Sequence, residues 1–275
     1  MHFNNAKIVR RRPALNTYRL FISTVAVFYF ILFGLAQSQP IPDYTILKTP
    51  GKIVIDGKLN EPGWQNIQFT APFVLHTDGS APVYQTKAKM LWDKKYLYIA
   101  FVMDDPDVWA KTKVWTDGPN KCLCREEVAE VFIDPDGDGS KYLEAEINPY
   151  GAVMDLWLEK EFKKGGKGDL AWSYKGLKIG ITVQGTLNDS TDVDTGWICE
   201  MAFPFKDIAP TAPSLHFPPK PGESWRLNLY RYDYLRTPEN KSELSAWSQT
   251  DKERGFHAPD RFGKVVFSGK KADKK

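Results

Sequence analysis

Short runs of β-branched and aromatic residues between frequent turn signals constrain this chain more than any other feature. The 275 residues include 19 Pro and 20 Gly, and helical periodicity is nearly absent. Several segments alternate polar and apolar residues, and residues 96–103 form a nearly continuous apolar run, typical of a strand covered on both faces. The sequence therefore predicts an all-β antiparallel β-sandwich in a single domain with few short helices.

The expected strands are short and are bounded by turn-forming residues. They lie at residues 53–55, 86–92, 96–103, 127–133, 142–148, 153–158, 177–183, 196–203, 225–233 and 262–267. Short helical turns are expected near residues 61–65 and 205–208. The Pro-rich segment 204–221 is interpreted as a long surface connection.

The first 36 residues have the layout of a secretory signal peptide. They contain basic residues and no acidic residue, followed by an apolar stretch that ends in Gly34-Leu35-Ala36. We therefore expect cleavage after Ala36 and a secreted, periplasmic or cell-surface protein. An uncleaved membrane anchor is the alternative.

The charge balance argues against nucleic acid as a partner. The whole chain has 37 Lys and Arg against 34 Asp and Glu, but the signal segment holds five of the basic residues, which leaves 32 against 34. Residues 269–275 form a short basic tail that we expect to be solvated. We expect no nucleic-acid footprint and no membrane contact beyond the signal segment.

The three cysteines do not predict a metal site. Cys122 and Cys124 are too close in sequence for an easy unstrained disulfide, and the odd count leaves at least one free thiol. Cys199 alternates with apolar residues, so it is expected to be a buried hydrophobe. The spacing does not match a zinc site.

Five blocks of sequence resemble, in order, the family 9 carbohydrate-binding modules. They are residues 53–64 (IVIDGKLNEPGW), 91–100 (LWDKKYLYIA), 130–138 (EVFIDPDGD), 196–204 (GWICEMAFP) and 256–263 (FHAPDRFG). The resemblance implies an immunoglobulin-like, DOMON-like sandwich over residues 44–268. It also implies sugar binding, in some members between two aromatic side chains, and attachment to xylanases.

The same resemblance carries over only part of a sugar site. Glu130 matches a site Glu of the family, and Phe256 stands where the family has its second stacking Trp. Cys124 stands where the family has its first stacking Trp, and Glu146 falls near a sugar-contacting Arg of some members. Trp115 or Trp157 could supply a replacement aromatic platform.

A sugar site needs an aromatic face together with charged or amide groups that bond hydroxyls. On the segments that carry the motifs, Arg231, Asn228 and His257 are such polar groups. Trp247 and Phe256 are the aromatic candidates, with a position in the core as the alternative for each. Glu130 could equally be an ion-paired residue of its strand.

Residues 134–139 are the best candidate for a metal site. Asp134, Asp136 and Asp138 place carboxylates at alternate positions of a Gly-rich turn, which suits a hard cation such as calcium. A solvated turn that uses Asp and Gly for backbone reasons is the alternative.

The sequence therefore predicts a non-catalytic module that binds a polysaccharide or oligosaccharide and assists carbohydrate catabolism. A glycoside hydrolase is one alternative, although no pair of carboxylates is singled out. A haem-binding redox domain would need axial Met and His ligands that converge on a pocket. A structural surface domain with a vestigial sugar site is the third alternative.

Overall fold

A computed structural model describes residues 39–114, 122–235 and 241–273. The strands of these residues are β1 (Asp43–Lys48), β2 (Val74–Leu75), β3 (Thr86–Trp92), β4 (Tyr96–Asp104), β5 (Val128–Asp134), β6 (Ser140–Ile147), β7 (Val153–Lys160), β8 (Gly168–Asp169), β9 (Lys178–Gln184), β10 (Gly196–Pro204), β11 (Ser224–Tyr234), β12 (Ser242–Ala246) and β13 (Gly263–Lys271). The helical elements are α1 (Pro62–Gln65), α2 (Phe205–Ile208), η1 (Leu123–Arg125), η2 (Phe162–Lys164), η3 (Ala209–Thr211) and η4 (Pro259–Arg261). The predicted all-β class with few short helices is confirmed.

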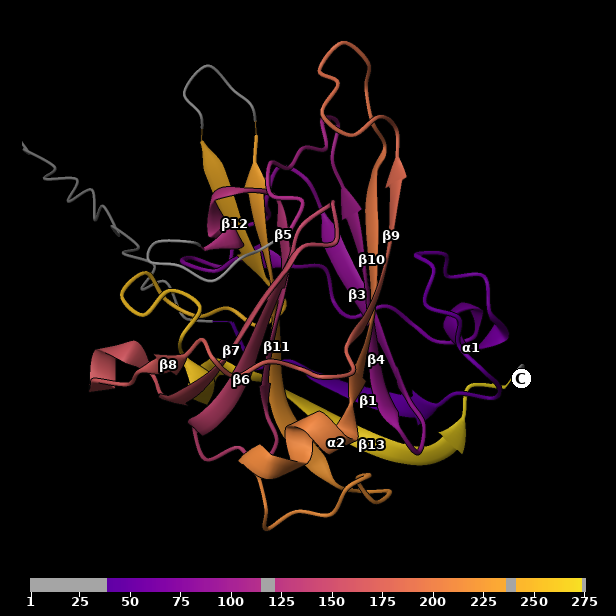
Figure 1. Cartoon of the computed structure of the whole chain (residues 1–275), viewed down its shortest axis with the longest axis vertical. Coiled ribbons are helices and arrows are strands. Elements are labelled where there is room, and N and C mark those ends of the chain that lie inside the picture. The colour runs from indigo at the N-terminus through magenta and orange to yellow at the C-terminus, as the bar shows by residue number, and fades with distance from the viewer. Residues whose placement is uncertain (1–38, 115–121, 236–240, 274–275) are drawn as a thin grey trace, which may run out of the picture. The chain divides into compact units, whose positions relative to one another are not determined.

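The strands form one continuous sheet that folds into two facing layers. Its order is β8-β7-β6-β5-β11-β13-β1-β3-β4-β10-β9. Outside this order, β12 pairs with both β11 and β2. Figure 1 shows β5 to β8 with β11 and β12 on one side, and β3, β4, β9 and β10 on the other. The strands β1 and β13 cross below both groups, and β1 is parallel to both β13 and β3. The two layers are therefore joined by hydrogen-bonded strands.

Apolar side chains from both layers fill the space between them. Alternation sends Leu97, Ile99 and Phe101 of β4 into this core, where they meet Val131 of β5 and Leu229 of β11. The intervening Tyr98 and Ala100 pack in a second apolar cluster on the opposite face of β4. The continuous apolar run at residues 96–103 thus reflects a strand buried on both faces, as predicted.

Two of the motif blocks meet at Glu200 of β10. The carboxylate of Glu200 accepts hydrogen bonds from the backbone N–H groups of Asp56 and Gly57, both at 3.0 Å, and from Nε1 of Trp64 at 2.9 Å. A Cβ on Gly57 would lie 2.6 Å from the backbone carbon of Ile181, and its φ is +77°, so only glycine fits this turn. These contacts join the first and fourth motif blocks, residues 53–64 and 196–204.

Two predictions about local structure are wrong. Residues 53–55 are not a strand, because the backbone there turns toward Glu200 and only the Ile53 side chain is buried. The segment 204–221 is not a surface connection throughout, because the helical turn predicted at residues 205–208 forms as α2 and places Phe205 and Ile208 in the core. In addition, β1, β2, β8 and β12 were not predicted.

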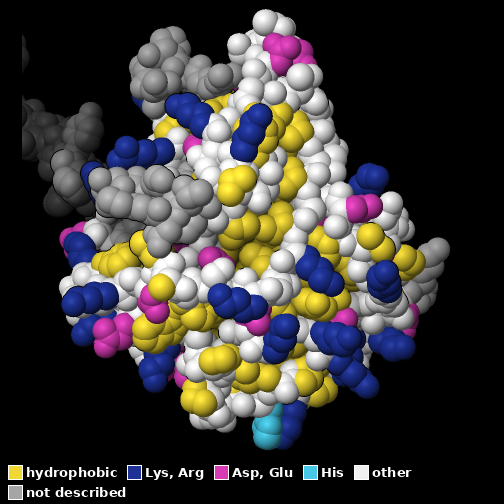
Figure 2. All heavy atoms as spheres, viewed as in Figure 1, with side chains coloured by type: hydrophobic (Ala, Val, Ile, Leu, Met, Phe, Trp, Pro, Cys, Tyr) yellow, Lys and Arg dark blue, Asp and Glu magenta, His cyan; other side chains and the backbone are white. Residues whose placement is uncertain are grey.

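The face of the molecule shown in Figure 2 carries both basic and acidic side chains. Apolar side chains gather in the middle of this face, and Lys and Arg side chains are scattered around them with fewer acidic ones. No helix in the described part of the chain is long and apolar enough to cross a membrane. The proposed signal segment, residues 1–36, lies outside the described residues.

Candidate functional site

Strand alternation gathers three glutamates on the outer face of the layer that contains β5 and β6. Ala129, Val131 and Ile133 of β5 point into the core between the layers, so Glu130 points outward. In the neighbouring strand, Glu146 pairs directly with Glu130, and Glu144 lies diagonally to it. One carboxylate oxygen from each lies within 4.8 Å of the others. We call these three residues the glutamate cluster.

The glutamate cluster is almost completely buried. The exposed fractions of Glu130, Glu144 and Glu146 are 2%, 4% and 3%. Burial raises the pKa of Glu130 and Glu144 well above the ordinary value, and the neighbouring carboxylates raise it further. Burial likewise raises the pKa of Glu146 to about 8, although backbone N–H groups oppose this shift. Glu130, which was predicted to bond a sugar, thus lies in a buried cluster of three carboxyl groups.

Sequence reasoning missed Glu144 as a site residue. The signal was present, because Tyr142, Glu144 and Glu146 alternate within the predicted strand at residues 142–148. In the structure, Glu144 Oε2 lies 3.9 Å from Nε2 of His257. His257 also shares a hydrogen bond of 3.1 Å with the Tyr142 hydroxyl. Burial lowers the pKa of His257 to about 4, so its imidazole is neutral at physiological pH.

Phe256 does not offer a free aromatic face. Its side chain is 4% exposed, and its ring stacks on Tyr230 with centroids 4.0 Å apart. The edges of His76 and Tyr232 close against it, with ring centroids 5.1 Å away in each case. The expectation of an exposed Phe256 platform is therefore wrong, because the C-terminal loop turns this ring inward against the outer face of β11.

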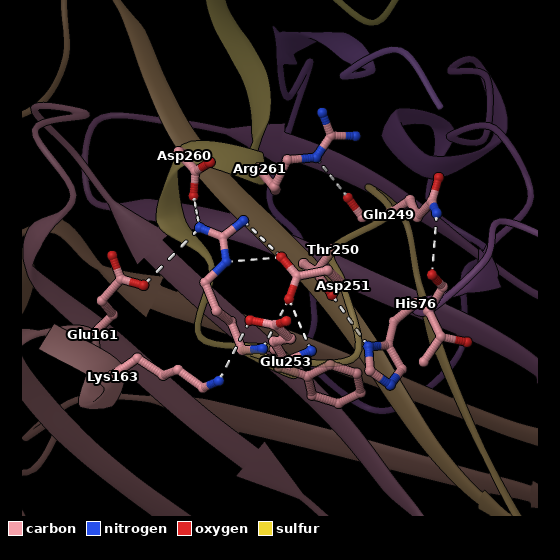
Figure 3. A network of polar contacts seen from close by, with 12 residues as sticks. His76, Glu161, Lys163, Gln249, Thr250, Asp251, Glu253, Asp260 and Arg261 are labelled. Carbon is pink, nitrogen blue, oxygen red and sulfur yellow. Dashed lines mark hydrogen bonds and ion pairs between the residues drawn. The ribbon is translucent and has the colours of Figure 1, made fainter. Parts of the chain in front are cut away.

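A network of charges fixes the loop that carries Phe256 and His257. The guanidinium of Arg254 pairs with Asp251 at 2.7 Å and also with Asp260. Glu161, at the start of the η2 turn, lies 4.0 Å from the same guanidinium. Figure 3 shows Asp251 and Asp260, from the loop itself, and Glu161, from the turn after β7, around the same guanidinium group. The loop is thus tied both to itself and to the turn that follows β7.

Arg231 lies on the opposite face of the same layer and is fully buried. Its guanidinium contacts three carboxylates, at 2.9 Å for Asp105, 3.2 Å for Asp233 and 3.6 Å for Glu127. It also donates to the backbone oxygen of Asp104 at 2.7 Å, which ties β11 to the facing layer. We call Arg231 and its three carboxylates the arginine cluster. Arg231 was expected to bond a sugar. Instead, its side chain points into the core between the layers, where it is a structural cross-link.

Trp247 and Cys124 are also unavailable as sugar platforms. Trp247 is 3% exposed and packs so closely on Gly263 that a Cβ there would lie 2.3 Å from its ring.

Cys124 forms a disulfide with Cys122, contrary to expectation, because the η1 turn brings their Cα atoms to 5.1 Å. Cys199 is free and buried, as predicted. Trp115 lies outside the described residues.

The Asp134–Asp138 turn is formed largely by its own hydrogen bonds. Both carboxylate oxygens of buried Asp134 accept backbone N–H bonds, from Gly137 at 3.0 Å and from Gly139 at 2.9 Å. Asp138 accepts two bonds of 2.7 Å from Ser140. Oxygens of Asp134, Asp136 and Asp138 nevertheless lie within 4.8 Å of one another, so calcium at this turn stays a prediction.

An open aromatic groove lies at the edge of the sandwich, between β6, β7 and the η3 turn. Its volume is about 290 Å³, and its lining is Lys141, Trp157, Trp172, Pro210 and Thr211. Both tryptophans are half-buried. Trp172 is fixed by an edge contact with Tyr174, at 4.6 Å between ring centroids. Trp157 was considered as a replacement platform from the sequence, whereas Trp172 was missed because it lies in a loop without a pattern.

Comparison with solved structures shows the fold. A carbohydrate-binding module of family 9 from Caldicellulosiruptor kristjanssonii, solved with glucose, has a TM-score of 0.54 at 14% identity and covers 82% of this chain and 96% of its own. The same kind of module solved with cellotriose gives 0.53 at 15%, covering 82% and 94%. A putative carbohydrate-binding protein from Bacteroides uniformis gives 0.60 at 16%, covering 83% and 100%.

Comparison of sequences extends this similarity to the family. Exoglucanase XynX of Acetivibrio thermocellus is 32% identical over 107 residues, which are 38% of this chain and 9% of that protein. The chain thus matches only a small part of that enzyme. A family model described as "Carbohydrate family 9 binding domain-like" matches residues 55–270. That match spans most of the chain and every strand from β2 to β12, so the chain belongs to the carbohydrate family 9 binding domain-like proteins.

Proposed function

We propose that this chain is a non-catalytic carbohydrate-binding module that assists enzymes of polysaccharide breakdown. The observation that carries the proposal is the family match over residues 55–270, on a sandwich similar to modules solved with glucose and cellotriose. The ligand would be a polysaccharide or oligosaccharide. The similarity to part of Exoglucanase XynX supports a role beside such enzymes.

We place the sugar in the groove of Trp157 and Trp172 rather than at Phe256. A pyranose ring has an apolar C–H face, which packs on an exposed aromatic ring, and hydroxyls that bond to polar groups. The groove offers two half-buried indoles, the exposed ammonium of Lys141 and the hydroxyl oxygen of Thr211. Phe256 cannot stack a sugar in this state, because Tyr230 already covers its face.

The positions of the carboxylates do not favour a glycoside hydrolase. Such enzymes hold two carboxyl groups about 5–9.5 Å apart, on either side of a glycosidic bond. The glutamate cluster has its oxygens within 4.8 Å and is nearly inaccessible. The arginine cluster lies between the layers, where no sugar can reach it.

Titration calorimetry with xylan and cellulose oligosaccharides, chosen after a glycan array, tests the proposal. We expect Trp157→Ala and Trp172→Ala each to weaken binding by about 1–3 kcal/mol, because each removes buried apolar contact. Tyr150→Ala is the matched control, since Tyr150 is an aromatic residue exposed elsewhere, at 37%. Circular dichroism checks that each variant folds.

The outcomes separate the two possible sugar sites. Normal binding by the folded Trp157→Ala and Trp172→Ala variants would contradict the groove. Loss of binding in a folded Glu130→Gln variant would instead return the ligand to the family's usual position. A wild-type chain that binds no glycan on the array would overturn the proposed function itself.

We also propose export and cleavage after Ala36, on the basis of the signal-like sequence of residues 1–36. Mass spectrometry of the protein from its native host tests this. A retained Met1 would contradict cleavage and favour an anchor.

A further inference from the structure

We propose that the glutamate cluster is a binding site for a divalent cation of the calcium class. The cluster consists of Glu130, Glu144 and Glu146, on the outer face of β5 and β6. This inference does not depend on the proposed sugar groove, which uses other residues.

The first argument is charge compensation. Buried carboxylates are stable as ions only when a cation or several donors balance them. Among the described residues, no Lys or Arg forms an ion pair with the cluster, and the imidazole of His257 lies 3.9 Å from Glu144. The arginine cluster has the same number of carboxylates and solves this problem with Arg231 at its centre.

The second argument is that oxygens in the cluster lack partners. Glu130 Oε2 and Glu144 Oε2 are buried, and neither has a hydrogen-bond partner. Both side chains are more than nine-tenths buried, and they contact each other. Without a cation, two carboxyl groups could coexist there only by sharing protons.

The third argument is geometry. Calcium binds oxygen ligands at about 2.3–2.6 Å, so two ligands of one ion can be almost 5 Å apart. One oxygen from each glutamate lies within 4.8 Å of the others, which meets this requirement. Glu146 is positioned by backbone N–H groups of Leu123 and Cys124, so the site is built by the η1 turn as well as by the strands. Three carboxylates without sulfur or imidazole in the set favour a hard cation.

Calorimetric titration of the purified chain with calcium, after removal of ions by a chelator, tests the proposal. We expect binding that raises the melting temperature, and at least about tenfold weaker affinity in Glu144→Gln and in Glu146→Gln, because each removes one charged ligand. Gln preserves the shape of the side chain, and circular dichroism verifies folding. Magnesium and manganese are titrated in parallel to define the class of ion.

Two controls make the assignment specific. Glu127→Gln removes a buried carboxylate from the arginine cluster, and we expect calcium binding to be unchanged. Asp136→Ala removes a ligand from the Asp134–Asp138 turn, and the ion at the glutamate cluster should remain. Calcium binding that survives Glu144→Gln and Glu146→Gln in the Asp136→Ala background, or a wild-type chain that binds none of the three ions at neutral pH, would overturn the proposal. Glycan binding is measured separately with the Trp157 variant, so failure of one proposal is distinguishable from failure of the other.

Discussion

The arginine cluster and the glutamate cluster lie on opposite faces of the same sheet layer, and each contains three buried carboxylates. Alternation along β5 and β11 decides the face: Ala129 pairs with Arg231 toward the core, and Glu130 pairs with Tyr230 on the outer side. Inside the sandwich, a guanidinium balances the acids and ties the layers together. On the outer face, no described Lys or Arg does so. The comparison shows that three buried carboxylates can form a structural cross-link around a guanidinium or, as we propose for the outer face, a site for a bound cation.

The largest expected effect comes from breaking the arginine cluster. Arg231→Met would leave Asp105, Glu127 and Asp233 buried without their cation, so we expect a loss of about 3–5 kcal/mol in the free energy of unfolding. Urea unfolding measures this change. Arg226→Met is the control, because Arg226 is only half-buried and donates to a single backbone oxygen, that of Phe262. Equal losses in both variants would contradict a special role for the cluster.

The next effect is the pH dependence of stability with a chelator present. Burial raises the pKa of Glu146 from its ordinary value of 4.5 to about 8, so the folded state binds more protons than the unfolded state between these values. The stabilisation is complete below pH 4.5 and is lost as the pH rises through 8. His257, whose pKa is lowered to about 4, acts in the opposite direction but only below its ordinary value of 6.5.

Between pH 6.5 and 8, the change of stability with pH therefore comes from the carboxyl groups and not from His257. We expect the free energy of unfolding to fall there by up to about 1.4 kcal/mol per pH unit for each group that stays protonated. Asp134 and Asp233, with pKa values raised by burial to about 7, share in this slope. The measurement is thus the difference between wild type and Glu146→Gln in urea unfolding. Equal slopes would show that Glu146 does not titrate as described.

A smaller effect should follow from giving the glutamate cluster a cation of its own. Glu146→Arg would place a guanidinium beside Glu130 and Glu144, as Arg231 stands among its acids. With chelator at pH 8, we expect a gain of about 1–2 kcal/mol in the free energy of unfolding, and we expect calcium to stabilise this variant less than it stabilises the wild type. Thermal melting with and without calcium tests both parts. A calcium response equal to that of wild type would contradict the equivalence of the two clusters.

The smallest effect concerns the Asp134–Asp138 turn. The carboxylates of Asp134 and Asp138 already accept hydrogen bonds within the turn, so calcium would gain little by replacing these bonds. We expect Asp136→Ala to remove a smaller part of the calcium-induced rise in melting temperature than Glu144→Gln does. The reverse order would make the turn the principal calcium site.

The sequence by itself determined the class of fold and most of its strands. Turn signals and alternation identified nine of the ten predicted strands, and the motif blocks identified the family. The strands β1, β2, β8 and β12 escaped prediction. Three of them are no longer than five residues, and β1 is defined by parallel pairing with distant strands.

Only the tertiary structure decided which candidates are accessible. Alternation could show that Glu130 and Arg231 lie on opposite faces, but not that loops would bury the outer face as well. Phe256 and Trp247 carry the same chemistry as Trp157 and Trp172, yet Tyr230 and Gly263 cover the first two, while the edge of the sandwich leaves the others open. Exposure depends on contacts between residues that are far apart in sequence, and no local pattern records those contacts.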